Sequence, residues 1–248
     1  MINTRNLAKV LGVALLATGL SSAAMAQRVS DFSLIDHYGK FHQVSRYADH
    51  DALVLFSYDK DSEVVEDSLR DFNRVMERFE EEDIAFFMLE STGIADKAVI
   101  SAAAADDEIE IPVLVDDTQT LSELLGVTRS AQVIVIDPSS REIVYNGSLN
   151  DRFTEGSSRR RARDHYLREV LETVVEGGEV SLVGQPSSGE AIVFGTRDQL
   201  ATAGLDYATD IVPIVERRCV SCHQDGGIAP FAMDSHQMLQ GWSPMIRE

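Results

Sequence analysis

The stretch ALVLFSY, residues 52–58, decides the fold of this chain. It is apolar at every position except Ser57, and it is short and rich in branched and aromatic side chains. Such a run is typical of a β-strand that is buried on both faces of a sheet. The sequence therefore predicts a central strand here, with helices packed on either side of it.

A helix pattern follows this strand directly, between residues 61 and 80. Asp61 or Ser62 can cap its start, because a short polar side chain accepts a hydrogen bond from the first free backbone N–H groups. Apolar residues then recur at spacings of three and four, which places them on one side of a helix. They are Val65, Leu69, Phe72, Met76 and Phe79.

The alternation of strands and helices continues to about residue 155. The early β-α-β order predicts parallel strands with helices on both faces, and the last two strands should form a hairpin. A final helix is expected before the Gly177-Gly178 pair. The expected strands are 84–89, 111–115, 132–136 and 142–145, and the expected helices are 95–105, 118–125 and 160–176.

This order resembles the thioredoxin-like fold, in its peroxiredoxin or redoxin branch, over roughly residues 30–150. The resemblance implies an α/β fold, a thioredoxin-like α/β/α sandwich, for a domain at 28–176. The segments that carry it are Asp31-Phe32-Ser33-Leu34 with Gly39-Lys40, the strand 53–58, Val115-Asp116-Asp117, Gly126-Val127-Thr128 and the strand 133–137.

Two departures from that family decide what the domain can do. Redoxins hold their reactive Cys just after the first long strand, at a helix N-terminus that favours the thiolate. Here the loop reads Tyr58-Asp59-Lys60-Asp61-Ser62, without Cys. The family's cis-proline is also absent from 128–132, and a non-proline cis bond would cost ~3 kcal/mol, so we expect trans peptides there. Thiol peroxidase and disulfide oxidoreductase chemistry are excluded, and the domain is expected to serve as scaffold or docking surface.

Both cysteines of the chain stand in Cys219-Val220-Ser221-Cys222-His223, a C-x-x-C-H pattern. Two thiols at this spacing can add to the two vinyl groups of one porphyrin, and the following His then binds the iron. A zinc site would require a second Cys or His pair at suitable spacing. We expect one covalent haem c, attached through Cys219 and Cys222, with His223 as proximal ligand.

The surrounding segment, 205–248, resembles small cytochrome c modules fused behind redoxin-like domains. Asp210 is the expected cap of a helix that contains Pro213 in its first turn and leads to Cys219. In relatives with this arrangement the chain continues beyond the point that corresponds to Glu248, so the module is expected to be incomplete. The match rests on 210–214, the C-x-x-C-H, 228–231 and 242–248.

The sequence alone does not identify the sixth iron ligand. A Met thioether opposite the His would suit an electron carrier. Met245 ranks first and Met238 second within the chain, with Met233 and His236 also in range. A ligand beyond residue 248 ranks above them all.

The N-terminus has the pattern of a secretory signal peptide at residues 1–26. Arg5 and Lys9 precede a short apolar run at 10–20, and Ala24-Met25-Ala26 is typical of a cleavage site. We expect cleavage after Ala26, a periplasmic or secreted protein and no transmembrane span in the mature chain; an uncleaved anchor is the alternative. Export suits covalent haem, which the cytochrome c maturation machinery attaches outside the cytoplasmic membrane.

The charge balance limits the possible partners. The formal charge of −19 excludes a nucleic-acid surface, which needs a basic stripe, and suits a basic redox partner. Within this acidic chain, 159–163 is a basic run, interpreted as a solvated helix start or as a dock for an acidic partner. Residues 177–204 are rich in Gly, Ser and Pro and are expected to form a linker that partly packs on a domain.

Three hypotheses for function follow. The first is an exported c-type haem protein that transfers electrons, with a thiol-free redoxin-like domain as scaffold. The second is the N-terminal part of a larger haem or copper oxidase or monooxygenase whose catalytic domain lies beyond this sequence. The third is a non-redox protein that binds a partner through Asp59–Ser62 or through the basic run.

Overall fold

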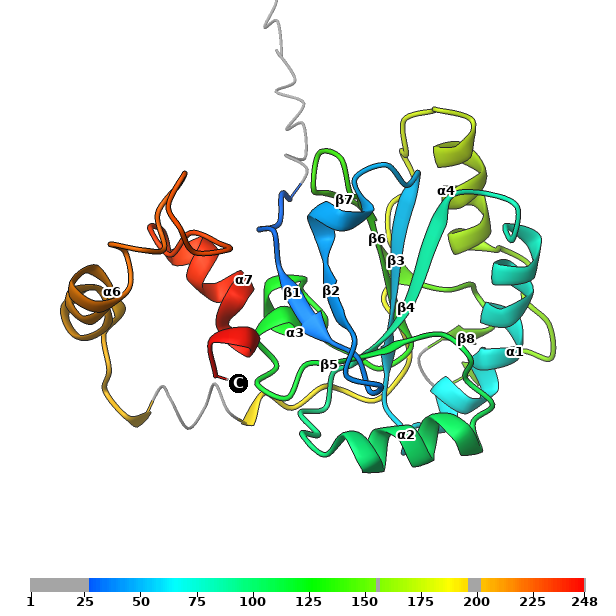
Figure 1. Cartoon of the computed structure of the whole chain (residues 1–248). Coiled ribbons are helices and arrows are strands. Elements are labelled where there is room, and N and C mark those ends of the chain that lie inside the picture. Colours follow the sequence, from blue (N-terminus) through cyan, green and yellow to red (C-terminus); the bar gives the residue numbers. More distant parts are fainter. Residues whose placement is uncertain (1–26, 155–156, 196–201, 248) are drawn as a thin grey trace, which may run out of the picture.

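The computed structural model describes residues 27–154, 157–195 and 202–247, and the expected signal peptide lies outside them. Figure 1 shows an α/β domain followed by a smaller, mostly helical segment. A five-stranded sheet with the order β5-β4-β3-β6-β7 forms the centre of the domain. Within the described residues, no helix is long and apolar enough to cross a membrane.

The central strand is β3, Ala52–Tyr58, and all of its residues are buried. It pairs in parallel with β4 (Ile84–Glu90), which pairs in parallel with β5 (Val113–Val115). On its other side β3 pairs antiparallel with β6 (Gln132–Asp137), and β6 forms a hairpin with β7 (Glu142–Ser148). The predicted parallel strands and the predicted final hairpin are confirmed.

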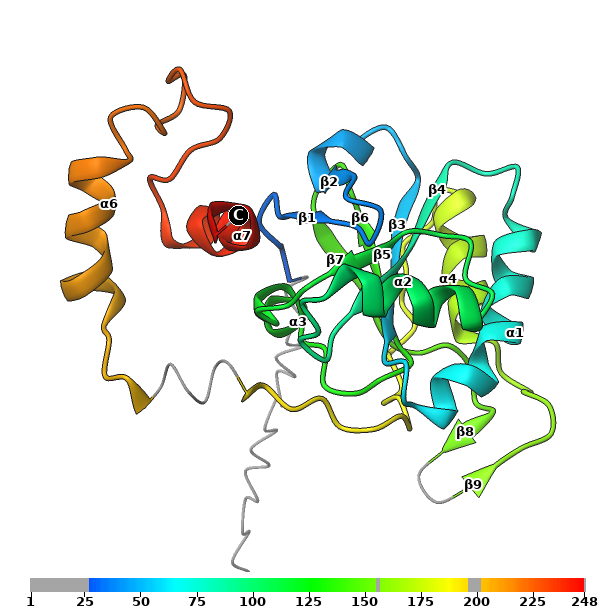
Figure 2. The same ribbon diagram turned by 60° about the horizontal axis from the view of Figure 1, so that its bottom comes forward.

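Alternating side chains of β3 enter two separate cores, because successive residues of a strand point to opposite faces. Val54 and Phe56 pack in the core beneath the helices α1 (Glu63–Arg78), α2 (Lys97–Asp106) and α4 (Tyr166–Val175). Leu53 and Leu55 pack in the core on the opposite face. Figure 2 shows α1 and α4 on one side of the sheet and α3 on the other.

The opposite face is covered by α3 (Thr120–Leu124) and by the antiparallel pair β1 (Ser33–Ile35) and β2 (Phe41–Gln43). The last helix of the chain, α7 (His236–Arg247), packs against β1 and α3. The cover on this face therefore includes the C-terminal segment, although that segment is far away in the sequence.

The helix start at Ser62 is confirmed, since its Oγ accepts a hydrogen bond from Val65 N at 3.1 Å. The expected helix 160–176 was wrong in its first turn, because α4 begins at Tyr166. Asp151 holds the preceding residues in a loop: its Oδ1 accepts from the backbone N–H groups of Arg163 (2.6 Å) and Asp164 (3.1 Å), and its Oδ2 from Arg159. The basic run therefore lies in a loop that follows the short hairpin β8–β9 (Phe153–Thr154 and Ser157–Ser158), not in a helix.

The C-terminal segment begins with a π-helical turn, η2 (Tyr207–Ile211), which runs into α6 (Val212–Arg218). Its cap is Asp206, which accepts from Thr209 N at 2.8 Å, so the expected cap at Asp210 was wrong. Asp210 instead turns back and accepts from Asp206 N at 2.7 Å. Pro213 lies in the first turn of α6 as predicted, where its missing N–H costs no hydrogen bond.

The buried carboxyl of Asp116 gives this fold a pH dependence. Its oxygens accept from Leu121 N, Ser122 N and Ser122 Oγ at the start of α3, but burial outweighs these bonds and raises its pKa to about 6. The folded state therefore binds this proton more tightly than the unfolded chain does. The contribution of Asp116 to the free energy of unfolding is largest below the ordinary pKa of a carboxyl group and decreases as pH rises through 6.

We predict that the free energy of unfolding of the wild type, minus that of Asp116→Asn, decreases by roughly 2–3 kcal/mol between pH 4 and pH 7. Denaturant unfolding at a series of pH values measures it. Glu81→Gln, at an exposed carboxylate, is the control. A difference that does not change with pH would contradict the assignment.

Candidate functional site

The place where a redoxin holds its thiol is occupied here by a cluster of hydroxyl groups and a carboxylate. Ser62 at the start of α1 and Ser130 in the loop before β6 are both buried, and their Oγ atoms lie 3.0 Å apart. Both hydroxyls hydrogen-bond to Glu190 Oε2, Ser130 at 2.8 Å. Ser130 belongs to the loop that holds the family's cis-proline, and no peptide bond is cis among the described residues.

Glu190 reaches this cluster from a segment that we name the strap, residues 185–192. The strap runs beside the loop 128–132, with an antiparallel bridge between Arg129 and Ala191. Ser130 N donates to Glu190 O at 2.9 Å, Glu190 N donates to Ser130 Oγ at 2.9 Å, and Ile192 N donates to Thr128 O at 2.9 Å. The prediction that the linker partly packs on the domain is thus correct for the strap.

The electrostatics of the cluster favour an ionised Glu190. Partial burial acts to raise its pKa, but the hydrogen bonds from the Ser62 and Ser130 hydroxyls outweigh this effect and lower the pKa. The carboxylate lies beside the N-terminus of α1, where the helix dipole also favours a negative charge. The site thus holds a fixed anion and contains no thiol.

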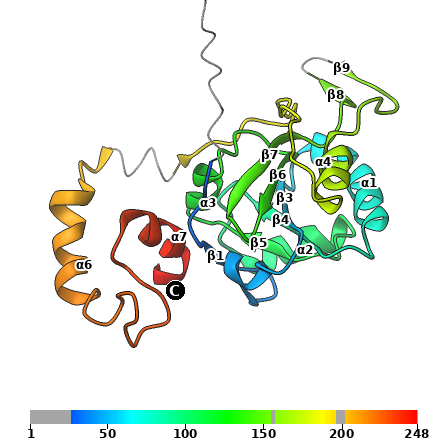
Figure 3. The same cartoon turned by 90° about the horizontal axis from the view of Figure 1, so that it is seen from above.

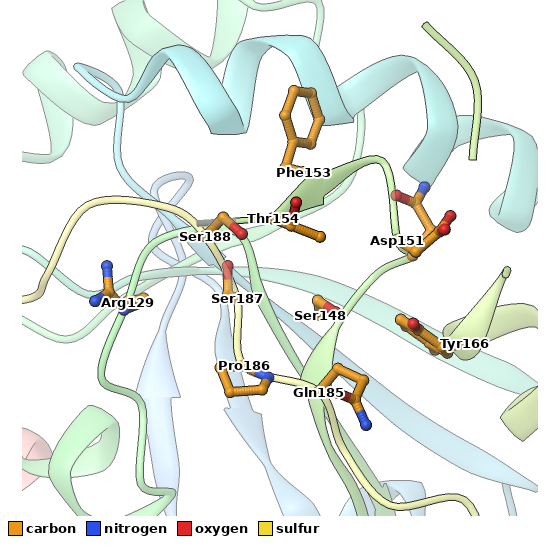
Figure 4. A pocket seen from close by; sticks show the side chains of 11 residues that line it. Arg129, Ser148, Asp151, Phe153, Thr154, Tyr166, Gln185, Pro186, Ser187 and Ser188 are labelled. Carbon is orange, nitrogen blue, oxygen red and sulfur yellow. The ribbon is translucent and has the colours of Figure 1, made fainter. Parts of the chain in front are cut away.

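A cavity of about 350 Å³ adjoins the strap (Figure 4). The strap forms one wall through Gln185, Pro186, Ser187 and Ser188. The opposite wall comes from β8 and the start of α4 and carries Phe153 and Tyr166. The Ser62–Ser130–Glu190 cluster and this cavity were not predicted from the sequence. The one sequence signal near them is the pair Gly184 and Gly189, which allows the strap to approach the domain closely.

The other expected docking residues are solvated or already paired. Lys60 Nζ lies 2.7 Å from Asp61 in an exposed loop, as its interpretation as a solvated loop predicted. Arg159 pairs with Asp151. Arg160 and Arg161 are exposed in the loop after β9.

The C-x-x-C-H motif forms one tight turn at the end of α6. Cys219 N donates to Val215 O at 2.8 Å, which continues the helix to the first cysteine. Cys222 N and His223 N then both donate to Cys219 O, at 3.1 and 2.9 Å. Both thiols are free; Cys219 is half-buried and Cys222 is exposed. The turn gathers the two sulfur atoms and the imidazole within five consecutive residues.

The imidazole of His223 is oriented by a backbone carbonyl. Its Nδ1 lies 2.9 Å from Phe231 O, and because a carbonyl can only accept, Nδ1 carries the proton. In the neutral imidazole this tautomer leaves the lone pair on Nε2. Histidines that bind a metal usually donate their other ring N–H in this way, which fixes the tautomer and raises the basicity of the ligand. The donor set therefore fits a haem iron bound through Nε2.

Among the described residues, no three His, Cys, Asp or Glu side chains are grouped so that they could hold a metal ion. A zinc site needs about four such ligands, whereas a haem needs only the two thiols and one axial His from this turn. The residues present therefore fit haem better than zinc.

The candidates for the distal ligand differ in their surroundings. Met238 is half-buried on α7, and Met233 is buried, with its N–H donating to His223 O at 2.7 Å. The ring of His236 packs 4.2 Å from that of Tyr207. The side chain of Met245 lies outside the described part of the structure. The choice of distal ligand stays a prediction.

The sheet order, the two-sided cover and the position of α1 after β3 are those of a thioredoxin-like fold. Residues 25–147 match the AhpC/TSA family. This part of the chain is an AhpC/TSA redoxin domain. No curated protein matches the chain significantly.

Two solved structures share the fold over two thirds of this chain. A hypothetical protein from Sinorhizobium meliloti 1021 is 19% identical, with a TM-score of 0.57 over 67% of this chain and 92% of that one. An uncharacterized conserved protein from Geobacillus kaustophilus is 17% identical, with a TM-score of 0.56 over 67% of this chain and 90% of that one. At these identities the similarity concerns the fold alone.

We predict that Gly189→Ala releases the strap, because a Cβ at residue 189 would lie 2.2 Å from Ser130 O. The expected result is faster proteolytic cleavage within 177–195 and a loss of roughly 1–3 kcal/mol in the free energy of unfolding. Limited proteolysis with mass spectrometry measures the first effect. Gly195→Ala is the matched control, since a Cβ there meets no atom within 4 Å. Equal cleavage of both variants would show that the strap is not seated as described.

Proposed function

We propose that this protein is an exported c-type haem protein that transfers electrons, and that its thiol-free redoxin domain is a scaffold. The observation that carries the proposal is the C-x-x-C-H turn in which His223 Nδ1 is already bonded to Phe231 O. Haem supplies the one-electron couple of its iron when it is bound. The secretory signal predicted from the sequence, with cleavage after Ala26, agrees with attachment outside the cytoplasm.

Each part of the turn has a role in this proposal. The Cys219 and Cys222 thiols would hold the haem by addition across its two vinyl groups, each sulfur taking one vinyl carbon and the thiol hydrogen the other, so that no oxidant would be needed. His223 would offer Nε2 to the iron. The carbonyl of Phe231, by accepting from Nδ1–H, would make the imidazole a stronger donor and so favour the oxidised state of the iron.

The scaffold role rests on the absence of thiols from the redoxin position. A thiol reaction there would need a cysteine beside α1, whereas Ser62 stands at that position and is bonded to Ser130 and Glu190. The formal charge of −19 supports a redox partner with a basic contact surface, because opposite charges steer association.

We expect covalent haem when the full chain is expressed for export together with the cytochrome c maturation machinery. The pyridine haemochrome spectrum and haem staining after denaturing electrophoresis measure it. Cys219→Ala with Cys222→Ala should abolish the covalent haem, and His223→Ala should abolish or strongly reduce it. Ser221→Ala, in the same turn but without a role as ligand, is the matched control. A wild-type protein free of covalent haem would overturn the proposal.

A further inference from the structure

The haem segment is joined to the redoxin domain by a stack of aromatic rings that begins at the proposed iron ligand. The ring of His223 lies 4.8 Å from that of Phe231. Phe231 stacks on Trp242 of α7, with 4.0 Å between ring centres and 7° between their planes. Trp242 in turn stacks at 6.0 Å and 20° on Phe41 of β2.

The end of this stack is fixed within the redoxin domain. Trp242 is only 4% exposed, and its indole N–H has no hydrogen-bond partner among the described residues, so ring packing holds it in place. The guanidinium of Arg46 lies 4.7 Å from the centre of the Phe41 ring, where a cation is attracted by the π system. Gly241 allows α7 to approach the domain closely, since a Cβ there would lie 2.6 Å from Ser30 Oγ.

The rest of the segment 205–248 packs much less tightly against the domain. In the described residues, α6 packs mainly against η2, and Figure 3 shows it lying away from the domain, with α7 between them. Ile214 on α6 is 51% exposed, and Ile228 after the motif is 92% exposed. The motif is bonded to the end of α6 and is joined to the domain through Phe231 and α7.

We propose that the redoxin domain is part of the haem site: Phe41 and Trp242 are positioning residues that hold Phe231, and Phe231 orients His223 with both its ring and its carbonyl. This inference rests on the proposed haem function and adds to it that the segment 205–248 is incomplete without the domain. The Phe231 carbonyl stays 2.9 Å from Nδ1 because the ring of the same residue is held against Trp242. Loss of Phe41 should loosen Trp242, then Phe231 and then the imidazole.

The first test needs no haem, because Trp242 is the chain's one tryptophan and reports on the stack directly. In the full chain carrying Cys219→Ala and Cys222→Ala, we expect Phe41→Ala and Phe231→Ala each to shift the Trp emission to the red and to increase its quenching by acrylamide. Tyr38→Ala, on the same hairpin but 71% exposed and in ring contact with His37, is the matched control and should change neither. Unchanged emission and quenching in Phe41→Ala would overturn the inference.

The second test uses the haem-loaded full chain and measures its reduction potential. We expect Phe41→Ala and Trp242→Ala to shift the potential and to raise the affinity for added imidazole, while Trp242→Phe, which keeps a ring in the stack, restores values closer to wild type. A role limited to stability would lower the unfolding midpoint without moving the potential. If haem attaches but Phe41→Ala has the potential of Tyr38→Ala, the inference fails and the haem function stands. If no variant, including the wild type, carries haem, the proposed function fails first and the inference with it.

Discussion

The burial of β3 on both faces is the constraint on which the rest of the structure depends. Each face of the strand is apolar, so both must be covered, at a gain of about 25 cal/mol for each Å² of apolar surface removed from water. Three helices cover one face. The other face has the short α3, the hairpin β1–β2 and the 3-10 helix η1 (Val44–Tyr47), and α7 packs against β1 and α3 from outside. The same architecture that buries β3 thus provides the surface to which the C-terminal segment attaches.

The sequence predicted those parts of the fold whose signals are local. The strand 52–58, the cap at Ser62 and the β6–β7 hairpin depend on periodicity, capping and turn chemistry, all of which lie within a few residues. The predicted start of α4 was wrong because the carboxylate of Asp151 accepts hydrogen bonds from the backbone of residues 163 and 164. Helix propensity does not account for such a long-range contact. The predicted cap at Asp210 was wrong because a second aspartate, Asp206, stands four residues earlier. The helix begins with a π-helical turn, and Asp206 is the residue that caps this turn.

The C-x-x-C-H motif and the Ser62–Ser130–Glu190 cluster differ in how far they could be predicted from sequence. The motif is five adjacent residues, so the chemistry proposed for it can be inferred without a structure. The Ser62–Ser130–Glu190 cluster brings together residues that are up to 128 positions apart, and no pattern predicts such a pairing. The aromatic stack from Phe41 to His223 has the same origin: each ring alone is an ordinary core or surface residue, and only the packing of α7 on the domain puts them in a row.

The strap has a consequence for how the C-terminal segment finds its place on the domain. Because residues 185–192 are bonded to the loop 128–132 and Gln119 Nε2 donates to Val193 O, the chain that separates the domain from η2 starts after Val193 and not at Gly177. The connection is then 194–206, less than half the length of the segment 177–206. A shorter connection raises the effective concentration of the C-terminal segment at the domain. The packing of α7 on β1 and α3 is an intramolecular contact, so it needs less binding free energy to stay formed than the same two surfaces would need on separate chains.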